Sequence, residues 1–271
     1  MNIHLQTCVG PIFVIGCPRS GTSVLAWSLA QHSRLWTSAE SDILHHLFGR
    51  GYADRAFRLA NERPDGSWIR VQGVDRAEFL GYLGLGINAL FTSRSQGKRW
   101  IDQSPTYTLM VDVLGDMFPD AFFLHILRDG RRVVNSMVNS GFGEQWSNDF
   151  REACKTWRHF VELAMCFCAE HPARSLTVMN EKLVEDPPAR FREIFDLIGV
   201  PYEEAPAEFI RTNRINSSYG KDSVAAAPRQ DGHGEPWNQW DAAQRRAFLD
   251  EAGPTLTRYG LATLSETESL R

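Results

Sequence analysis

A glycine-rich loop between a short apolar run and a helical segment constrains the fold of this 271-residue chain more than any other feature. Residues 11–16 (PIFVIG) are rich in β-branched side chains and end at glycine, which predicts a buried strand. Residues 22–32 contain no helix breaker and are apolar on most sides, which predicts a buried helix. The loop that joins them, residues 16–23 (GCPRSGTS), has the spacing Gly16-x4-Gly21 that is typical of phosphate-binding loops.

The rest of the chain continues the alternation of strands and helices. Apolar runs predict two further buried strands, over residues 121–127 and 175–179. Helical patterns lie between and after them, at residues 76–93, 105–117, 130–139, 148–170 and 188–199. Because strands that alternate with helices form parallel sheets covered on both faces, we predict a three-layer, P-loop-like α/β fold. The length suits a single domain over residues 1–271, and no clear linker divides it.

The loop after the first predicted strand suits an anion such as phosphate or sulfate. Backbone N–H groups line such a loop, and the helix N-terminus that follows adds a partial positive charge. Side-chain donors are added by Arg19, Ser20, Thr22 and Ser23. The alternative is a tight strand-to-helix turn that binds nothing, and this density of donors disfavours it.

One position in the loop departs from the pattern of ATP-binding proteins. Thr22 occupies the place of the lysine that holds the β- and γ-phosphates, and Arg19 within the loop supplies a cation instead. A P-loop kinase or NTPase would also need an acidic residue for magnesium. Asp129 follows the second predicted strand, but the adjacent Arg128 makes a metal site there less attractive. We therefore expect no metal, and we keep a phosphoryl transferase as an alternative.

A second motif, residues 127–136 (LRDGRRVVNS), places Arg128 at the end of a predicted parallel strand. Ligands of open parallel sheets bind outside the carboxyl ends of the strands. In the helix predicted next, Val133 and Val134 belong to an apolar stripe, whereas Ser136 lies on another face. Arg128 and Ser136 are therefore predicted to converge on one anionic group, as a guanidinium fork assisted by a hydroxyl.

Charge and cysteine content exclude several other classes. A formal net charge of -4 argues against a general binder of nucleic acid or anionic membranes. The five cysteines are odd in number and scattered, so neither a disulfide framework nor a zinc site is expected. No apolar run approaches the roughly 20 residues of a membrane span. The first residues do not resemble a signal peptide, and we expect a cytoplasmic location.

The two motifs together resemble the two cofactor signatures of sulfotransferases, which use 3'-phosphoadenosine 5'-phosphosulfate (PAPS). The resemblance is closest to the tyrosylprotein and bacterial branches, which have Arg in the first loop where many cytosolic members have Lys. Weaker likenesses lie at residues 100–105 (WIDQSP), 180–187 (NEKLVEDP) and 195–201 (FDLIGVP). The resemblance implies sulfuryl transfer from PAPS to an acceptor hydroxyl without a metal.

The resemblance also implies a role for each motif residue. Arg19 would contact the transferring sulfuryl group and the leaving phosphate. Glu40 has the spacing of the base in the tyrosylprotein branch, although an acid near a helix N-terminus can also simply satisfy local donors. The cradle of the 5'-phosphate is implied for Ser20, Gly21, Thr22 and Ser23. The remaining nucleotide contacts are implied for Arg128 and Ser136 at the 3'-phosphate and for Ser217 and Ser218 in a closing segment.

Three positions differ from the family pattern. Gln103 stands where the family often has Lys, so we expect Arg19 or a cation from residues 216–236 to compensate. Asn180 replaces a Tyr, and Ser140 stands where the tyrosylprotein branch has a further Arg. These differences argue against peptide tyrosine, and we expect a small-molecule, carbohydrate or lipid hydroxyl as acceptor.

Two stretches are predicted to select the acceptor, because loops and insertions carry specificity on α/β scaffolds. The first is a helical region over residues 43–95, which contains the Gly- and Arg-rich interruption at residues 50–75. The second is the long loop over residues 216–236.

Two further readings remain at this stage. Residues 84–89 (GLGINA) fit a dinucleotide-binding pattern, but the preceding segment looks helical, which disfavours a Rossmann oxidoreductase. A nucleotide-binding protein without catalytic activity is the other alternative, and the presence of Arg19 and Glu40 argues against it.

Overall fold

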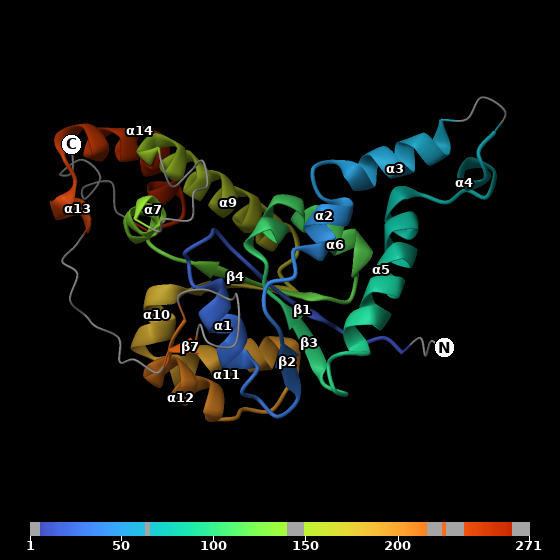
Figure 1. The fold of residues 1–271 in the computed structure, drawn as a ribbon, viewed down its shortest axis with the longest axis horizontal. Coiled ribbons are helices and arrows are strands. Elements are labelled where there is room, and N and C mark those ends of the chain that lie inside the picture. Colours follow the sequence, from blue (N-terminus) through green and yellow to red (C-terminus); the bar gives the residue numbers. More distant parts are fainter. Residues whose placement is uncertain (1–5, 63–65, 140–148, 216–223, 226–235, 262–271) are drawn as a thin grey trace.

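The computed structural model describes residues 6–62, 66–139, 149–215, 224–225 and 236–261 (Figure 1). A sheet of five parallel strands forms its centre, in the order β2-β3-β1-β4-β5. The strands are β1 (Ile12–Ile15), β2 (Leu35–Thr37), β3 (Arg99–Asp102), β4 (Phe122–Leu127) and β5 (Ser175–Met179). Since all five run in the same direction, their carboxyl ends lie along one edge of the sheet.

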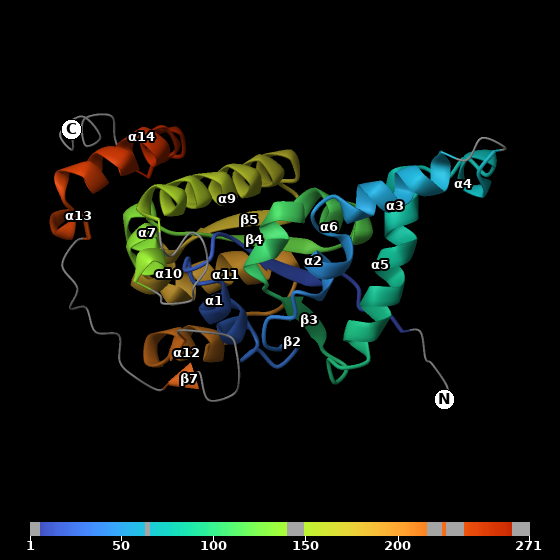
Figure 2. The same ribbon diagram turned by 45° about the horizontal axis from the view of Figure 1, so that its top comes forward.

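One face of the sheet is covered by the first helix and by three helices that follow β5 (Figure 2). These helices are α1 (Thr22–Leu29), α10 (Asn180–Glu185), α11 (Pro187–Ile198) and α12 (Ala205–Thr212). Alternate residues of the strands, including Ile12, Val14 and Leu124, point into this layer and are fully buried. Because strand side chains alternate between faces, their neighbours serve the opposite layer.

The opposite face packs against α5 (Arg76–Thr92), the 3-10 helix η1 (Pro105–Met110), α6 (Val111–Met117) and α9 (Phe150–Glu170). Phe13 and Phe123 point into this layer, where Phe13 stacks on Phe123 with a centroid distance of 5.4 Å. Gly84 of α5 is part of this packing, because a Cβ there would lie 1.9 Å from the Met117 carbonyl oxygen. The GLGINA pattern therefore lies inside a helix, as its sequence context indicated, and serves close helix packing.

Three short helices extend from the body beside α5. They are α2 (Ile43–Phe48), α3 (Tyr52–Asn61) and α4 (Trp68–Val71), and Figure 1 shows α3 and α4 projecting from the sheet layers. The interruption predicted at residues 50–75 thus contains regular helix. The Asp75 side chain caps the N-terminus of α5 by accepting from the Glu78 N–H group at 2.8 Å, and α5 then packs against the sheet.

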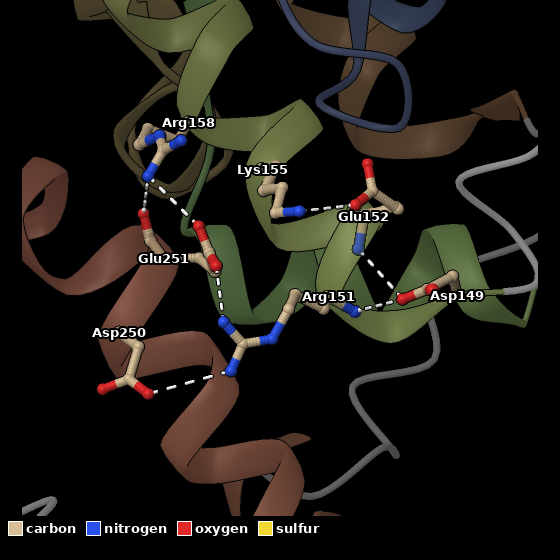
Figure 3. Close-up of polar contacts among 7 residues, drawn as sticks. All are labelled: Asp149, Arg151, Glu152, Lys155, Arg158, Asp250 and Glu251. Carbon is tan, nitrogen blue, oxygen red and sulfur yellow. Dashed lines mark hydrogen bonds and ion pairs between the residues drawn. The ribbon is translucent and has the colours of Figure 1, made fainter.

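The last part of the described chain packs across α9. It comprises α13 (Pro236–Gln239) and α14 (Ala242–Arg258), which lie against α9 and α7 (Gly130–Val138) in the same apolar cluster. Figure 3 shows how Glu251 of α14 joins two arginines of α9, with Arg151 Nη1 at 2.6 Å and Arg158 Nη1 at 3.2 Å. Trp240 Nε1 also donates to Asn135 Oδ1 of α7 at 3.3 Å, so this C-terminal unit is fixed to the helix that follows β4.

The predicted three-layer α/β fold is confirmed, as are the predicted strands at residues 11–16, 121–127 and 175–179. Two strands were not predicted, because β2 has three residues and β3 begins with a charged arginine. A small antiparallel pair, β6 (Arg214–Ile215) and β7 (Val224–Ala225), lies outside the main sheet.

Candidate functional site

The phosphate-type loop begins at the carboxyl end of β1 and ends in α1. Three of its residues have positive φ: Gly16 at 153°, Arg19 at 70° and Gly21 at 106°. Glycine is also required by close approach, since a Cβ would lie 2.6 Å from the Ile126 carbonyl oxygen at Gly16 and 2.5 Å from Asn180 Nδ2 at Gly21. The sequence thus permits a tightly wound loop pressed against β4 and the end of β5.

Two carbonyl groups of this loop are held from outside. Arg128 Nη1 donates to the Arg19 carbonyl at 2.9 Å, and Asn180 Nδ2 donates to the Ser20 carbonyl at 3.0 Å. Because a trans peptide directs its C=O and N–H in opposite directions, the N–H group of Gly21 points away from Asn180. The departure at Asn180 therefore has a structural role, which is to fix the orientation of a loop peptide.

The second motif meets the first directly. Arg19 Nε donates to Ser136 Oγ of α7 at 3.1 Å, and Arg128 lies at the carboxyl end of the neighbouring strand β4. Trp157 Nε1 donates to the Arg128 carbonyl at 3.3 Å. Arg19 thus contacts both Ser136 and Arg128, and the three side chains form one polar cluster beside the loop.

Asp129 has a different function from that of a metal ligand. Its side chain caps α7 by accepting from the Arg131 N–H group at 2.8 Å, and it also pairs with the Arg131 guanidinium at 2.6 Å. Thr22, at the position of the P-loop lysine, is the first residue of α1 and is buried. Among the described residues, no group of three or more His, Cys, Asp or Glu side chains is placed to hold a metal ion.

Glu40 lies in the segment between β2 and α2, next to the loop. Ser23 Oγ donates to Glu40 Oε1 at 3.4 Å, which places the carboxylate beside the first turn of α1. The side chain is neither buried nor fully exposed. A partly accessible carboxylate at the rim of an anion-binding loop can accept a proton from a group that approaches the bound anion.

A buried polar cluster lies behind Glu40. Asp102 at the end of β3 accepts from Ser41 Oγ at 2.9 Å, from Tyr107 Oη at 3.0 Å and from the Gln103 N–H group at 2.8 Å. Burial raises the pKa of Asp102 from 3.8 to about 6, although these hydrogen bonds favour the charged form. Burial and the neighbouring Asp102 charge raise the pKa of Tyr107 above its ordinary value.

Gln103, which replaces the family lysine, is fully buried in the same region. Its Nε2 donates to the Ser38 carbonyl at 3.3 Å, so it contacts the segment that carries Glu40. The structure thus gives Gln103 a contact with the backbone two residues before Glu40.

Every strand of the sheet contributes to this site at its carboxyl end. The contributions are Glu40 after β2, Asp102 and Gln103 at β3, the loop after β1, Arg128 after β4 and Asn180 after β5. The predicted Ser217 and Ser218, and Ser140, lie outside the described residues. Asp102 and its partners Ser41 and Tyr107 were not predicted from the sequence. The available signal was the position of Asp102, whose carboxylate directly follows the apolar residues Trp100 and Ile101.

This combination of a five-stranded parallel sheet, helices on both faces and a phosphate-type loop after the central strand defines a P-loop-like α/β protein. The model of the sulfotransferase family matches residues 11–204. The chain belongs to the sulfotransferase family, and the resemblance found in the two motifs is confirmed.

Curated relatives agree with this assignment. The chain is 25% identical over 202 residues to protein-tyrosine sulfotransferase A of Caenorhabditis elegans, covering 71% of this chain and 50% of the relative. It is 26% identical over 200 residues to protein-tyrosine sulfotransferase 2 of Gallus gallus, covering 71% of this chain and 52% of that protein. The chain therefore spans about half the length of these curated relatives.

Solved structures share the fold. The sulfotransferase domain of the Synechococcus PCC 7002 olefin synthase has a TM-score of 0.53 at 21% identity, with 94% of this chain and 98% of that chain covered. A mouse sulfotransferase complexed with PAP has a TM-score of 0.54 at 15% identity, with 96% and 87% covered. Among the described residues, no helix is long and apolar enough to cross a membrane.

Proposed function

We propose that this protein transfers the sulfuryl group of PAPS to the hydroxyl group of an acceptor. The observation that carries the proposal is the junction at the sheet edge. There the phosphate-type loop contacts both the second motif, through Arg19 and Ser136, and the carboxylate of Glu40, through Ser23. These contacts support a site in which the groups that would bind the donor and the carboxylate that would accept the proton lie next to one loop, as transfer between two bound molecules requires.

The residues present fit an anionic nucleotide. The loop is pressed so closely against its surroundings that a Cβ at Gly16 or Gly21 would collide, and Arg128 and Asn180 hold two of its carbonyl groups. Arg19 and the backbone N–H groups of the loop would hold the 5'-phosphosulfate end, and Arg128 with Ser136 would hold the 3'-phosphate. PAPS would supply the sulfuryl group and a phosphate leaving group.

The chain's own residues would assist transfer in two ways, by accepting a proton and by stabilising negative charge. Glu40 would accept the proton of the acceptor hydroxyl, which requires an approach to about 2.6–3.2 Å. Arg19 would stabilise the negative charge that grows on the bridging phosphate oxygen, together with the loop N–H groups and the N-terminus of α1. These groups sit on strand ends and a tightly wound loop, so little reorganisation would be needed.

Phosphoryl transfer from ATP is the weaker alternative. The position of the P-loop lysine is Thr22, whose side chain is buried in α1. The carboxylate of Asp129 is engaged by Arg131 and by the first turn of α7. The proposal therefore does not include an ATP-dependent step.

For the acceptor we propose a small-molecule, carbohydrate or lipid hydroxyl. The relatives named above are protein-tyrosine sulfotransferases, and peptide tyrosine is the class to compare against. Gln103, which stands where the family often has a lysine, contributes an uncharged amide that contacts the backbone of residue 38. At the position of residue 103 the protein would therefore present no lysine cation to the acceptor.

The proposal is tested by transfer of label from [³⁵S]PAPS to a panel of hydroxyl acceptors and to a cell extract, followed by identification of the labelled product. We expect a labelled non-peptide product that disappears with Glu40→Gln. Label in peptide tyrosine would overturn the acceptor class but keep the reaction. PAPS binding without transfer to any acceptor or extract component would support a non-catalytic nucleotide-binding protein.

A further inference from the structure

The segment that carries Glu40 is held on both sides of that residue by the stretch that follows β3. Gln103 Nε2 donates to the Ser38 carbonyl at 3.3 Å. The N–H group of Asp42 donates to Ser104 Oγ at 3.0 Å. Residues 38–42 and 102–107 follow adjacent parallel strands, β2 and β3, so this contact is a consequence of the sheet order. The position of Glu40 therefore depends on the residues that follow β3.

Asp102 is the most deeply placed of these residues. It is 3% exposed, and its Oδ2 accepts from both Ser41 and Tyr107, while its Oδ1 accepts from the Gln103 N–H group. Ser41 Oγ and Tyr107 Oη are also 2.8 Å apart, so the three side chains form one compact polar cluster. A buried carboxylate is costly unless it is hydrogen-bonded, and here three donors offset part of the cost of burial. Ser41 follows Glu40 directly in the chain.

We propose that Asp102 is a positioning residue that fixes residues 38–42 through Ser41 and Tyr107, and thereby holds Glu40 against the phosphate-type loop. The inference rests on the proposed role of Glu40 as base. Asp102 itself is buried behind the segment and acts through Ser41 rather than on the reacting atoms. Its contribution lies in accepting three hydrogen bonds at once, which orients both strand-end segments.

The decisive variant is Asp102→Asn, which keeps the shape of the side chain. The amide cannot accept from Ser41, Tyr107 and the Gln103 N–H group together, because only one of its two terminal atoms is an oxygen. The matched control is Asp120→Asn. Asp120 also accepts from a backbone N–H group, that of Gly10 at 2.7 Å, but Gly10 precedes β1 and so lies at its amino end. We expect this control to leave turnover unchanged.

The kinetic test is a double-mutant cycle with Glu40→Gln, using [³⁵S]PAPS and the best acceptor found. Asp102→Asn should lower kcat at least about tenfold, because small misplacements of a reacting group are costly. The Kd of PAP, measured by calorimetry, should change less than about twofold, because the loop contacts remain. Combined with Glu40→Gln, Asp102→Asn should cause no further loss. An unchanged kcat, or losses that multiply in the double variant, would overturn the proposal.

Hydrogen exchange separates this proposal from the function it rests on. The Asp42 N–H group donates to Ser104 and the Leu44 N–H group lies 3.4 Å from Tyr107 Oη, so both amides report on the segment. Asp102→Asn should speed their exchange, and amides of β4 should be unaffected. If Glu40→Gln keeps full turnover, the base assignment fails, and this measurement still decides whether Asp102 holds the segment.

A milder variant covers the case in which Asp102→Asn does not fold. Ser41→Ala removes one of the donors to Asp102 and retains the Asp102 carboxylate. Like Asp102→Asn, this variant should lower kcat, and the Asp42 N–H group should exchange faster than in the wild type. Protection of Asp42 equal to that of the wild-type chain would contradict the proposal.

Discussion

Arg19 Nε donates to Ser136 Oγ at 3.1 Å, and this bond joins the loop after β1 directly to the helix that follows β4. The Arg19 carbonyl is held in turn by Arg128 at 2.9 Å. The two motifs, more than 100 residues apart in sequence, therefore form one contiguous unit, which we propose binds the anionic groups of the donor. Arg19 is its centre, since it contacts the second motif through both its side chain and its backbone.

This position predicts that Arg19→Ala lowers turnover by about 10²-fold or more, the usual scale for loss of a group that stabilises developing charge. Arg19→Lys should recover part of the loss, because it restores a cation without the planar fork. Steady-state rates of label transfer from PAPS check this. If both variants had wild-type kcat, Arg19 would have no role in charge stabilisation.

Arg128→Ala should mainly weaken nucleotide binding. The variant removes a donor to the Arg19 carbonyl and the proposed contact with the 3'-phosphate, and charged hydrogen bonds contribute about 1.5–3 kcal/mol each. We therefore expect PAP to bind about 10- to 100-fold more weakly by calorimetry. Arg190→Ala is the control, because Arg190 pairs with Glu193 on α11. Equal PAP affinities of the two variants would contradict the assignment.

Gly21→Ala should abolish PAP binding and destabilise the protein. The added Cβ meets Asn180 Nδ2 at 2.5 Å, and a φ of 106° is unfavourable for alanine. Gly73→Ala is a matched control, since Gly73 has a φ of 71° but no neighbour within 4 Å of the added atom. The control should cost about 1–2 kcal/mol for backbone strain alone. Urea denaturation and calorimetry should show the larger loss at Gly21. Similar effects of the two substitutions would mean that the contact with Asn180 is unimportant.

Asp102 should make the free energy of unfolding depend on pH with a definite sign. Its pKa is raised from 3.8 to about 6 in the folded chain, so the folded state binds the proton more tightly than the unfolded state. Its stabilising contribution is complete below pH 3.8 and is lost as pH rises through about 6. As pH rises from acidic to neutral, the free energy of unfolding of Asp102→Asn should therefore rise relative to that of the wild type, by up to about 3 kcal/mol. Urea titrations over this range check it, and parallel pH profiles of the two proteins would contradict it.

Glu251→Gln tests the attachment of α14 to α9. Glu251 joins Arg151 and Arg158, but both arginine side chains are more than a third exposed, at 48% and 37%, so solvent screens these pairs (Figure 3). We expect a loss of no more than about 1 kcal/mol, seen as a small fall in Tm. Asp250→Asn, whose pair with Arg151 is longer at 3.8 Å, should have almost no effect. A larger loss at Asp250 than at Glu251 would reverse this ranking.

The sequence predicted the central part of the fold because its strongest patterns lie there. β1 is entirely apolar and β4 is apolar except for His125, as buried parallel strands require, while β5 keeps three apolar residues of five. β2 was not predicted because it has only three residues, and β3 was not predicted because charged residues, Arg99 and Asp102, occupy both of its ends. Short strands depend on their neighbours for stability, and a periodicity window does not contain that information.

Residues of the candidate site were predicted from the sequence only where they belong to one of the two motifs. The structure brings Arg128 and Ser136 to Arg19 of the loop, because strand ends of a parallel sheet share one edge, and their joint hold on one anionic group stays a prediction. The contact of Asn180 with the loop joins residues 160 positions apart. The cluster at Asp102 likewise depends on the strand order β2-β3-β1, which no local pattern specifies.

The choice between PAPS and ATP as donor decides whether this protein transfers a sulfuryl or a phosphoryl group. The wild-type protein would be incubated in parallel with [³⁵S]PAPS and with [γ-³²P]ATP and magnesium, with a cell extract as the source of acceptors, and with Glu40→Gln as the control. We predict transfer of ³⁵S alone and its loss in Glu40→Gln. Transfer of ³²P, or transfer of ³⁵S at the same rate by both proteins, would contradict it.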